Sequence, residues 1–519
     1  MIRPGIRGQA MKKTVDCAAV DLGASGGKVM LGRFDGSRVT LEEIYRFPNG
    51  PIQSGQHIHW DVRRLFEEVK QGLGMVGRAA RLVSVGLDAW GNDFCLLDSD
   101  GALLEDPHSY RDPRTDGVME KCFQKMPRED IYNKTGVQFM QHNTLFQVYS
   151  MVLERSPLIE SAATYLMMGD LFNYWLCGAK ACEFTNATTT QFYDPNKRDW
   201  CLPILEAFNI PARIMPPIIQ PATKLGMLQS AICKELNMLT LPVIAVGTHD
   251  TASAAVAVPY SRGVPSGAPA DRLPSPDNAA FLSSGTWSLM GAEVGEPLIN
   301  SVGLKHNFTC YGGVGGAWLV WKNIQALWVL QECIRNWKEA GQHYILENLF
   351  SLAERAEPFA ALIDVDNRLF LTPGDFPERI REYCRHSGQR PPEGEGAIVR
   401  CILESLALKY RYTFEHLQDV LGRKLDRIHV IGGGSLNTLL NRFTAGAVGV
   451  PVVAGPAEAT ALGNFLTQLM ALGEIGSLSQ AREIVDRSFE TIVYEPVSEE
   501  SLDDAFGRFL TLSDKSGQV

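Results

Sequence analysis

The alternation of apolar runs, glycine-rich turns and amphipathic segments predicts an α/β chain. Apolar residues at 17–34 are interrupted by a glycine-rich turn, which is typical of a β-hairpin, and a third strand is expected at 40–48. At 60–76 apolar residues recur three and four positions apart, which predicts an amphipathic helix, and 82–90 predicts another buried strand. The chain therefore starts with three strands, a helix and a fourth strand.

The second half of the chain repeats this pattern. Residues 279–294 again form two apolar runs around a glycine-centred turn, and 397–422 predicts a long helix. Residues 427–455 predict a strand, a glycine-rich turn, a helix and a further strand. We expect a duplicated α/β unit with a cleft between the copies. Both glycine-rich hairpins would face that cleft, because ligands bind where such turns cluster at strand ends.

A segment rich in Pro, Gly, Ser and Asp separates the two copies. We predict a linker at 259–278, between a first domain at 1–258 and a second at 279–490, with a tail at 491–519. A chain of 519 residues is too long for one hydrophobic core, which agrees with two domains.

One apolar stretch, 320–334, predicts a helix that carries two polar side chains, Asn323 and Gln331. Eight residues apart on a helix, these side chains differ by about 80° and would share one broad face. The alternative interpretation is that each of them is simply exposed to solvent.

Composition and charge exclude several classes of partner. The formal net charge of −10 leaves no basic face for nucleic acid. No apolar run has the length needed to span a bilayer, so no membrane partner is expected. The eleven cysteines are scattered without a CxxC pair, which is typical of free thiols in a reducing compartment. We expect a cytoplasmic protein with small-molecule partners, either a monomer or a homodimer.

The turn "DLGASGGK" at 21–28 is a candidate phosphate-binding site. Its small residues let backbone N–H groups approach an anion, while Ser25 adds a hydroxyl and Lys28 a positive charge. The spacing is not that of a Walker A loop, because a strand rather than a helix follows. The alternative is an ordinary glycine hairpin.

Two later glycine-rich turns strengthen the phosphate hypothesis. "SSGTWSLMG" at 283–291 carries Thr286 at its tip and corresponds in position to the first turn. Two such turns facing one cleft are what a nucleoside triphosphate would need. The glycines at 432–434 precede a helix, whose N-terminus suits a base or a phosphate, although many α/β folds use such glycines only for close packing.

An ionisable turn at His249, Asp250 and Thr251 interrupts two apolar segments. It follows a strand at 241–246 and precedes a helix expected to begin near Ala252. Asp250 or Thr251 would be a good N-cap, but capping does not explain three polar residues together. A carboxylate at the cleft end of a strand can accept the proton of a substrate hydroxyl, so Asp250 is a candidate general base.

The stretch "LDAWGNDFCLLD" at 87–98 is a candidate sugar site. Its aromatic ring would pack on the sugar while its acids, Asp88 and Asp93, would bind hydroxyls, with Trp90 in the core as the alternative. His57 and His59 have no Cys or His partner at metal spacing, so we interpret them as surface or hydrogen-bonded residues. Structural salt bridging is favoured for the turn at 110–117.

Taken together, these motifs resemble the FGGY family of carbohydrate kinases. The matching stretches extend over about 18–470 and include "VDLGASGGKVML", "LDAWGNDFCLLD", "NATTTQ", "THDTASA", "SSGTWSLMG", "GGGSLNTLLN" and "GPAEATALGN". The resemblance implies two actin-like, ribonuclease-H-like domains with ATP and sugar in the interdomain cleft. It also implies Mg²⁺-dependent transfer of the ATP γ-phosphoryl group to O1 of a ketose, which is L-rhamnulose in the branch that these motifs match best.

The resemblance assigns a role to each matching position. Asp250 would be the general base, and Asp21 would lie near the metal, through a water molecule. The sugar would contact Gly91, His249, Thr251 and Asn323. ATP would contact Ala24, Ser25, Gly26, Gly27, Lys28, Thr286, Gln331 and Gly433.

Three positions depart from the family pattern as we know it. Gly26 lacks a hydroxyl, Lys28 replaces an arginine without its guanidinium fork, and Asn92 replaces an apolar residue near the sugar. These departures affect ATP affinity and sugar preference, so another ketose such as L-fuculose or L-xylulose remains an alternative substrate. A non-enzymatic, actin-like ATP-binding scaffold is the alternative outside the enzymes.

Overall fold

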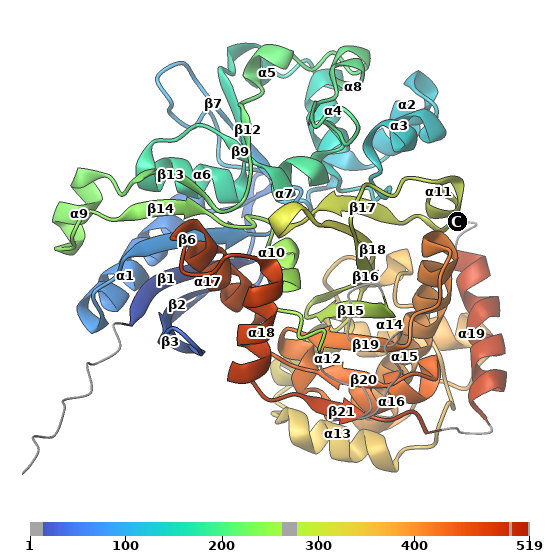
Figure 1. Cartoon of the computed structure of the whole chain (residues 1–519). Helices are drawn as coiled ribbons and strands as arrows, with labels where there is room; N and C mark the ends of the chain where they lie inside the picture. Colours follow the sequence, from blue (N-terminus) through green and yellow to red (C-terminus); the bar gives the residue numbers. More distant parts are fainter. Residues whose placement is uncertain (1–13, 262–277, 498–500, 517–519) are drawn as a thin grey trace, which may run out of the picture.

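The computed structural model describes residues 14–261, 278–497 and 501–516. It has two halves, each built around one twisted mixed β-sheet with helices packed on its faces (Figure 1). The repeated α/β architecture predicted from the sequence is confirmed. Most of the predicted linker, 262–277, lies outside the described residues.

The first half is organised on a six-stranded sheet in the order β13-β14-β6-β1-β2-β3. Strands β1 to β3 form an antiparallel meander, while β6 and β14 run parallel to β1 and continue the sheet. The strands are β1 (Val15–Gly23), β2 (Gly26–Phe34), β3 (Val39–Pro48), β6 (Ser84–Ala89), β13 (Thr223–Met227) and β14 (Pro242–Ala245). Helix α1 (Val62–Ala79) packs on this sheet, as its apolar periodicity predicted.

An insertion of short elements extends the first half beyond its sheet, at the top of Figure 1. Its strands are β4 (Ile52–Ser54), β5 (His57–His59), β7 (Phe94–Leu97), β8 (Thr164–Met167), β9 (Cys182–Glu183), β10 (Tyr193–Asp194), β11 (Asp199–Trp200) and β12 (Ile218–Ile219). The helices of the first half that follow α1 are α2 (Val118–Lys125), α3 (Arg128–Thr135), α4 (Thr144–Leu153), α5 (Pro157–Ser161), α6 (Met168–Cys177), α7 (Phe184–Ala187), α8 (Leu202–Ala207) and α9 (Ser230–Leu236). Of these, α6 packs against the six-stranded sheet.

The second half repeats the same order in a seven-stranded sheet, β17-β18-β16-β15-β19-β20-β21. Strands β15, β16 and β18 are antiparallel, and β19 and β20 run parallel to β15. The strands are β15 (Ala279–Ser284), β16 (Trp287–Val294), β17 (Thr309–Gly312), β18 (Trp318–Gln325), β19 (Arg427–Ile431), β20 (Val452–Ala454) and β21 (Ile492–Tyr494). Strand β21, from the segment predicted as a tail, forms the edge of this sheet.

Helices cover the second sheet and connect it to the first. They are α10 (Asp250–Val256), α11 (Ser301–His306), α12 (Trp328–Glu339), α13 (Leu346–Arg355), α14 (Phe376–His386), α15 (Gly394–Leu421), α16 (Thr438–Val448), α17 (Ala459–Ala471), α18 (Leu478–Ser488) and α19 (Leu502–Ser516). The long helix predicted at 397–422 is confirmed as α15.

Helix α17 crosses from the second half onto the sheet of the first, where Figure 1 draws it in orange beside β1 and β6. Asn464 donates from Nδ2 to Asp88 Oδ2 at 2.7 Å, and Gln468 donates from Nε2 to the carbonyl of Ala18 at 3.0 Å. Gly463 packs on α10 so closely that a Cβ there would lie 1.8 Å from the Ser253 carbonyl oxygen. The two halves are therefore joined through buried polar contacts and one close helix crossing.

Two predicted elements are wrong in detail. The stretch 320–334 is not one helix, because its first part belongs to β18 and only the part from Trp328 is helical, as α12. An apolar run cannot by itself distinguish a strand from a helix, and here pairing with β16 and β17 decides. Helix α10 begins at Asp250 rather than near Ala252, with His249 as its N-cap residue.

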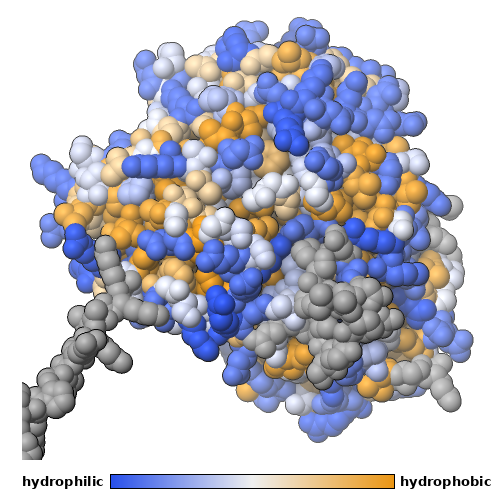
Figure 2. Space-filling model, in the orientation of Figure 1, coloured by the Kyte–Doolittle hydropathy of each residue, from blue (hydrophilic) through white to orange (hydrophobic). Residues whose placement is uncertain are grey.

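In the described part of the chain, no helix combines the length and the apolar character that crossing a membrane requires. On the face drawn in Figure 2, apolar side chains occur in separate patches between hydrophilic ones.

Candidate active site

A cavity of about 520 Å³ lies between the two halves. Both glycine hairpins, β1–β2 and β15–β16, contribute their turns to its wall, as the sequence predicted. Thirteen of the predicted site residues line it: Asp21, Ala24, Ser25, Gly26, Lys28, Gly91, His249, Asp250, Thr251, Thr286, Asn323, Gln331 and Gly433.

Among the residues to which the family resemblance assigned a role, Gly27 alone does not line the cavity. It is buried, and a Cβ at this position would lie 2.2 Å from the ring of Phe47 on β3. Gly27 is therefore a packing residue that lets the ring lie under the turn, and its direct contact with ATP is not supported.

Asp250 is the first residue of α10, and its side chain is 31% exposed toward the cavity. Its Oδ1 accepts hydrogen bonds from the Thr251 amide at 2.6 Å and from Thr251 Oγ1 at 3.2 Å. No hydrogen bond to Oδ2 is recorded among the described residues. Burial raises the pKa of this carboxyl to about 6, although both contacts with Thr251 lower it. Asp250 is thus a fixed carboxylate whose pKa suits a base near neutral pH.

His249 is held beside Asp250 as a neutral imidazole. Its ring is 5.7 Å from that of Trp321 at an interplanar angle of 30°, and its amide donates to Thr185 Oγ1 at 3.2 Å. Burial lowers the pKa of His249 to about 4. Its Nε2 lies 3.6 Å from Asp250 Oδ1. A Cβ on Gly91 would lie 3.0 Å from this ring, so glycine leaves room for the histidine.

The two acids predicted to bind sugar hydroxyls have structural roles instead. Asp93 is fully buried, and its Oδ2 accepts from the indole nitrogens of Trp60 at 2.6 Å and Trp90 at 2.9 Å. Gln147 donates to its other oxygen at 3.0 Å. Asp88 is also fully buried and binds α17. Trp90 itself lines the cavity, so Asp93 fixes the aromatic wall without reaching it.

Asn323 reaches the cavity from β18 and is held by a residue that sequence reasoning missed. Gln138 Oε1 accepts from both the amide and Nδ2 of Asn323 at 3.1 Å. Two further residues after Gln138, Met140 and His142, also line the cavity. Burial, and then the charge of Arg111, lower the pKa of His142 to about 4. These residues lie in a loop without periodicity. The stretch "IYNKTGVQF", which contains Gln138, matches the family pattern, but nothing in it indicated a role for these side chains.

The end of the cavity that the two glycine hairpins line contains an ion pair that joins the halves. Lys28 Nζ lies 2.5 Å from Glu458 Oε2, and both side chains are partly exposed, at 22% and 37%. Glu458 immediately precedes α17, so this pair connects β2 with the second half. Across the cavity, Thr286 Oγ1 donates to Gln331 Oε1 at 3.3 Å.

The carboxylates at this end fit a divalent cation. Burial raises the pKa of Asp21 to about 7; Lys28 lowers it, while Asp250 and Glu458 raise it. Asp21 and Asp250 both line the cavity and offer oxygen atoms, the donors that Mg²⁺ prefers. A carboxylate whose pKa is raised by neighbouring acids would be stabilised in its charged form by a cation bound beside it.

The fold is similar to those of solved structures. The chain is similar to gluconate kinase from Lactobacillus acidophilus, with a TM-score of 0.76 and 14% identity over 98% of both chains. It is also similar to xylulose kinase from the same organism, with a TM-score of 0.76, 15% identity and 97% and 98% coverage. The two halves and their cavity therefore define a two-domain, actin-like α/β protein of the sugar-kinase type, as expected.

The chain belongs to the FGGY family of carbohydrate kinases. The model of the family's N-terminal domain matches residues 17–257, and that of its C-terminal domain matches 280–472. The chain is 41% identical to a rhamnulokinase of Bacteroides thetaiotaomicron, over 95% of this chain and 98% of the relative. It is 36% identical to a rhamnulokinase of Oceanobacillus iheyensis, over 93% and 98%. The predicted family is confirmed, and the protein is a carbohydrate kinase.

Proposed function

We propose that the protein transfers the γ-phosphoryl group of ATP to O1 of L-rhamnulose, giving L-rhamnulose 1-phosphate. The observation that carries this proposal is the position of Asp250, whose free carboxylate oxygen faces a cavity lined by both glycine hairpins. The names of the similar rhamnulokinases support L-rhamnulose as the acceptor.

Asp250 is the proposed general base. Its Oδ1 is held by Thr251, so Oδ2 is the atom that accepts the proton of the acceptor hydroxyl as the new P–O bond forms. With a pKa of about 6, most of this carboxylate is ionised at pH 7. General base catalysis of this kind contributes about 10²–10⁴-fold to the rate.

The sugar occupies the end of the cavity formed by Trp90, Gly91, His249 and Asn323 in this proposal. The neutral His249 ring can donate or accept one hydrogen bond to a hydroxyl without adding charge near Asp250. Gln138 orients the amide of Asn323, which leaves the Asn323 Oδ1 atom available as an acceptor for a hydroxyl.

ATP occupies the opposite end, between the two hairpins. The backbone amides at 24–26 and the Lys28 charge would bind phosphate oxygens, while Thr286, Gln331 and Gly433 border the cavity from the second half. Mg²⁺ is proposed near Asp21, where it would neutralise charge on the transferring phosphoryl group. The polar groups of both halves would surround that group and exclude water as a competing acceptor.

The proposed division of the chain follows the same arrangement. Residues 1–258 would provide the base, most of the acceptor site and the first glycine hairpin, and 279–490 would provide Asn323 and the rest of the nucleotide site. Residues 259–278 would be the linker, and the predicted tail at 491–519 adds β21 to the edge of the second sheet. A cytoplasmic location is proposed from the eleven free cysteines, all but Cys177 buried.

The test is a comparison of ADP release with different ketoses. Purified protein with ATP and Mg²⁺ is assayed with L-rhamnulose, L-fuculose and L-xylulose, and kcat/KM is measured for each. We expect ADP release to require a ketose, with L-rhamnulose at least tenfold better than the others. A higher kcat/KM for L-fuculose or L-xylulose would replace the substrate assignment. ATP binding without ketose-dependent ADP release would favour a scaffold instead.

A further inference from the structure

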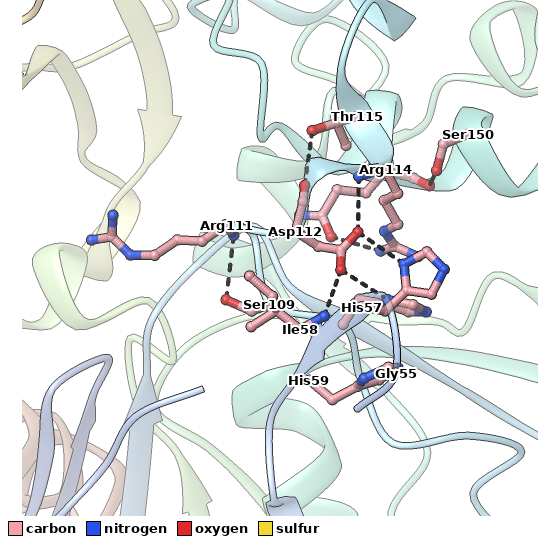
Figure 3. A network of polar contacts seen from close by, with 12 residues as sticks. Gly55, His57, Ile58, His59, Ser109, Arg111, Asp112, Arg114, Thr115 and Ser150 are labelled. Carbon is pink, nitrogen blue, oxygen red and sulfur yellow. Dashed lines mark hydrogen bonds and ion pairs between the residues drawn. The ribbon is translucent and has the colours of Figure 1, made fainter. Parts of the chain in front are cut away.

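Outside the cavity, the first half brings three histidines, His57, His59 and His108, together with the carboxylates of Glu105 and Asp112. Figure 3 shows His57, His59 and Asp112 of this group. Hairpin β4–β5 carries His57 and His59, and His59 pairs with His108 in an isolated antiparallel bridge. The ring centroids of His59 and His108 are 4.2 Å apart. The sequence spacing offered His59 no partner, because His108 is 49 positions later in the chain.

Three of these side chains face one another as metal ligands do. His59 Nε2 lies 3.8 Å from Glu105 Oε1, and His108 Nε2 lies 3.7 Å from Glu105 Oε2. The three ligand atoms all lie within 4.8 Å of one another. Zinc bonds of about 2.0–2.1 Å in a tetrahedron put ligand atoms roughly 3.3 Å apart. The two nitrogen–oxygen distances exceed this spacing by about half an ångström, so binding would draw the three side chains closer together.

His59 lacks the hydrogen bonds that a buried imidazole normally has. It is 7% exposed, its Nδ1 has no hydrogen-bond partner in the described structure, and its Nε2 approaches only Glu105. Burial, and then the neighbouring His108, lower the pKa of His59, so its ring is neutral near pH 7. A neutral imidazole with a free lone pair is the form that binds a metal.

Asp112 lies on the other side of the second histidine. His108 Nδ1 faces Asp112 Oδ2 at 3.9 Å, a separation longer than a hydrogen bond. The Asp112 carboxylate is fixed by the amides of Ile58 at 2.6 Å and Arg114 at 2.8 Å, and by His57 Nδ1 at 3.2 Å. A carboxylate behind a histidine is the usual arrangement at zinc sites, because it orients the ring and increases its basicity.

We propose that His59, His108 and Glu105 form a binding site for a divalent transition-metal ion of the zinc type. Two imidazoles and one carboxylate suit zinc better than Mg²⁺ or Ca²⁺, which prefer oxygen ligands. Glu105 is 44% exposed, which gives the ion a path from solvent and leaves room for a water ligand. Tyr110, two residues after His108, lines the sugar-kinase cavity, so the ion would tie hairpin β4–β5 to a cavity-forming loop.

A second histidine pair in the protein is less suited to a cation. His306 and His416 have ring centroids 3.8 Å apart, with Asp419 close by. Burial lowers the pKa of both rings, and the charge of Lys322 lowers them further. The same positive charge would repel a metal ion, so this pair serves as the internal control.

The test uses the full-length chain without a histidine tag, freed of metal with a chelator and then titrated with Zn²⁺ by calorimetry, in the absence of ATP and Mg²⁺. We expect one ion per chain with a Kd below about 10 μM. Glu105→Gln keeps the shape of an exposed residue and should weaken binding at least tenfold, and His59→Gln should weaken it further. Circular dichroism establishes that each variant is folded.

Two control variants assign the ion to its ligands. His416→Gln and Cys177→Ser should leave the affinity within twofold of the original protein, because neither residue belongs to the site. The absence of stoichiometric Zn²⁺ binding would overturn the proposal. So would unchanged affinity in folded Glu105→Gln, or loss of binding in His416→Gln or Cys177→Ser.

Discussion

At the residue scale, Asp250 lies at the N-terminus of α10, where burial makes its ionised form unfavourable. The pKa of Asp250 is raised to about 6 because burial outweighs the two contacts with Thr251. A base with a pKa near the working pH is ionised yet still able to accept a proton, which is the compromise that general base catalysis requires. The ionised carboxylate that catalysis requires is therefore expected to lower the stability of the folded protein.

Replacing Asp250 with Asn should remove the base and keep the shape. The Asn oxygen can still accept from the Thr251 amide, so α10 should form normally. We expect kcat to fall about 10²–10⁴-fold, with the KM for ATP changed less than threefold. The measurement is steady-state kinetics beside Asp504→Asn, an exposed acid on α19 that should have full activity. Turnover close to the original value would remove Asp250 from the mechanism.

The pH dependence follows from the same raised pKa. Because the base must be ionised, kcat/KM should fall as pH decreases through about 6, with a slope of one. Ionisation is also unfavourable in the folded state, so this acid contributes stability below about pH 4 and loses that contribution as pH rises through 6. Asp250→Asn should thus raise the melting temperature at pH 8 but not at pH 4. A lower melting temperature at pH 8 would contradict this account.

At the element scale, one glycine permits the crossing of α10 and α17. A Cβ on Gly463 would lie 1.8 Å from the Ser253 carbonyl oxygen and 2.6 Å from its carbon, both backbone atoms that cannot rotate away. The same helix carries Asn464 and Gln468 onto the first sheet. The crossing therefore sets the distance between the two halves, and with it the width of the cavity.

Gly463→Ala should destabilise the protein despite the higher helix propensity of alanine. Moving two packed helices apart costs about 1–3 kcal/mol or more, as other overpacked cores do. The control is Gly507→Ala on α19, where a Cβ meets nothing within 4 Å and should stabilise by about 0.5–1 kcal/mol. Urea unfolding of both variants gives the comparison, and equal stabilisation by both would show that the crossing is not tight.

At the scale of the whole molecule, the two halves meet through charges as well as helices. Lys28 on the first half pairs with Glu458 on the second, in the position where the ATP phosphates are proposed to bind. Partly exposed ion pairs are worth about 0–1 kcal/mol, so the pair is a weak connection that phosphate could displace. In the proposed complex, Lys28 would thus be shared between Glu458 and the ATP phosphates.

Two substitutions test the two contacts of Lys28 separately. Lys28→Gln removes the phosphate contact and should weaken ATP binding about tenfold. Glu458→Gln frees Lys28 from its competitor and should tighten ATP binding by about two- to fivefold, which corresponds to the small free energy of an exposed pair. Calorimetric titration with ATP measures both changes. Weaker binding in Glu458→Gln would mean that the carboxylate itself contributes to the nucleotide site.

The sequence alone determined the repeated α/β pattern, the two glycine hairpins and the position of Asp250 in a turn that lines the cavity, because each depends on periodicity or on local turn chemistry. The sequence did not determine which side chains of these motifs line the cavity and which point into the protein. Gly27 and Asp93 both belong to well-placed motifs, yet one packs on Phe47 and the other holds two tryptophans. The direction of a side chain depends on strand pairing and packing, which the spacing of residues does not encode.

Only the tertiary structure decided the contacts between distant segments. The stretch 320–334 became a strand followed by a helix because β16 and β17 were available as pairing partners. Gln138 contacts Asn323, 185 positions later in the chain, and His59 pairs with His108, 49 positions later. Gln138 and His108 lie in loops that carry no periodic signal. Local patterns determine local conformation. Contacts between distant residues depend on how all the elements pack around the core, so they can be identified only in the folded structure.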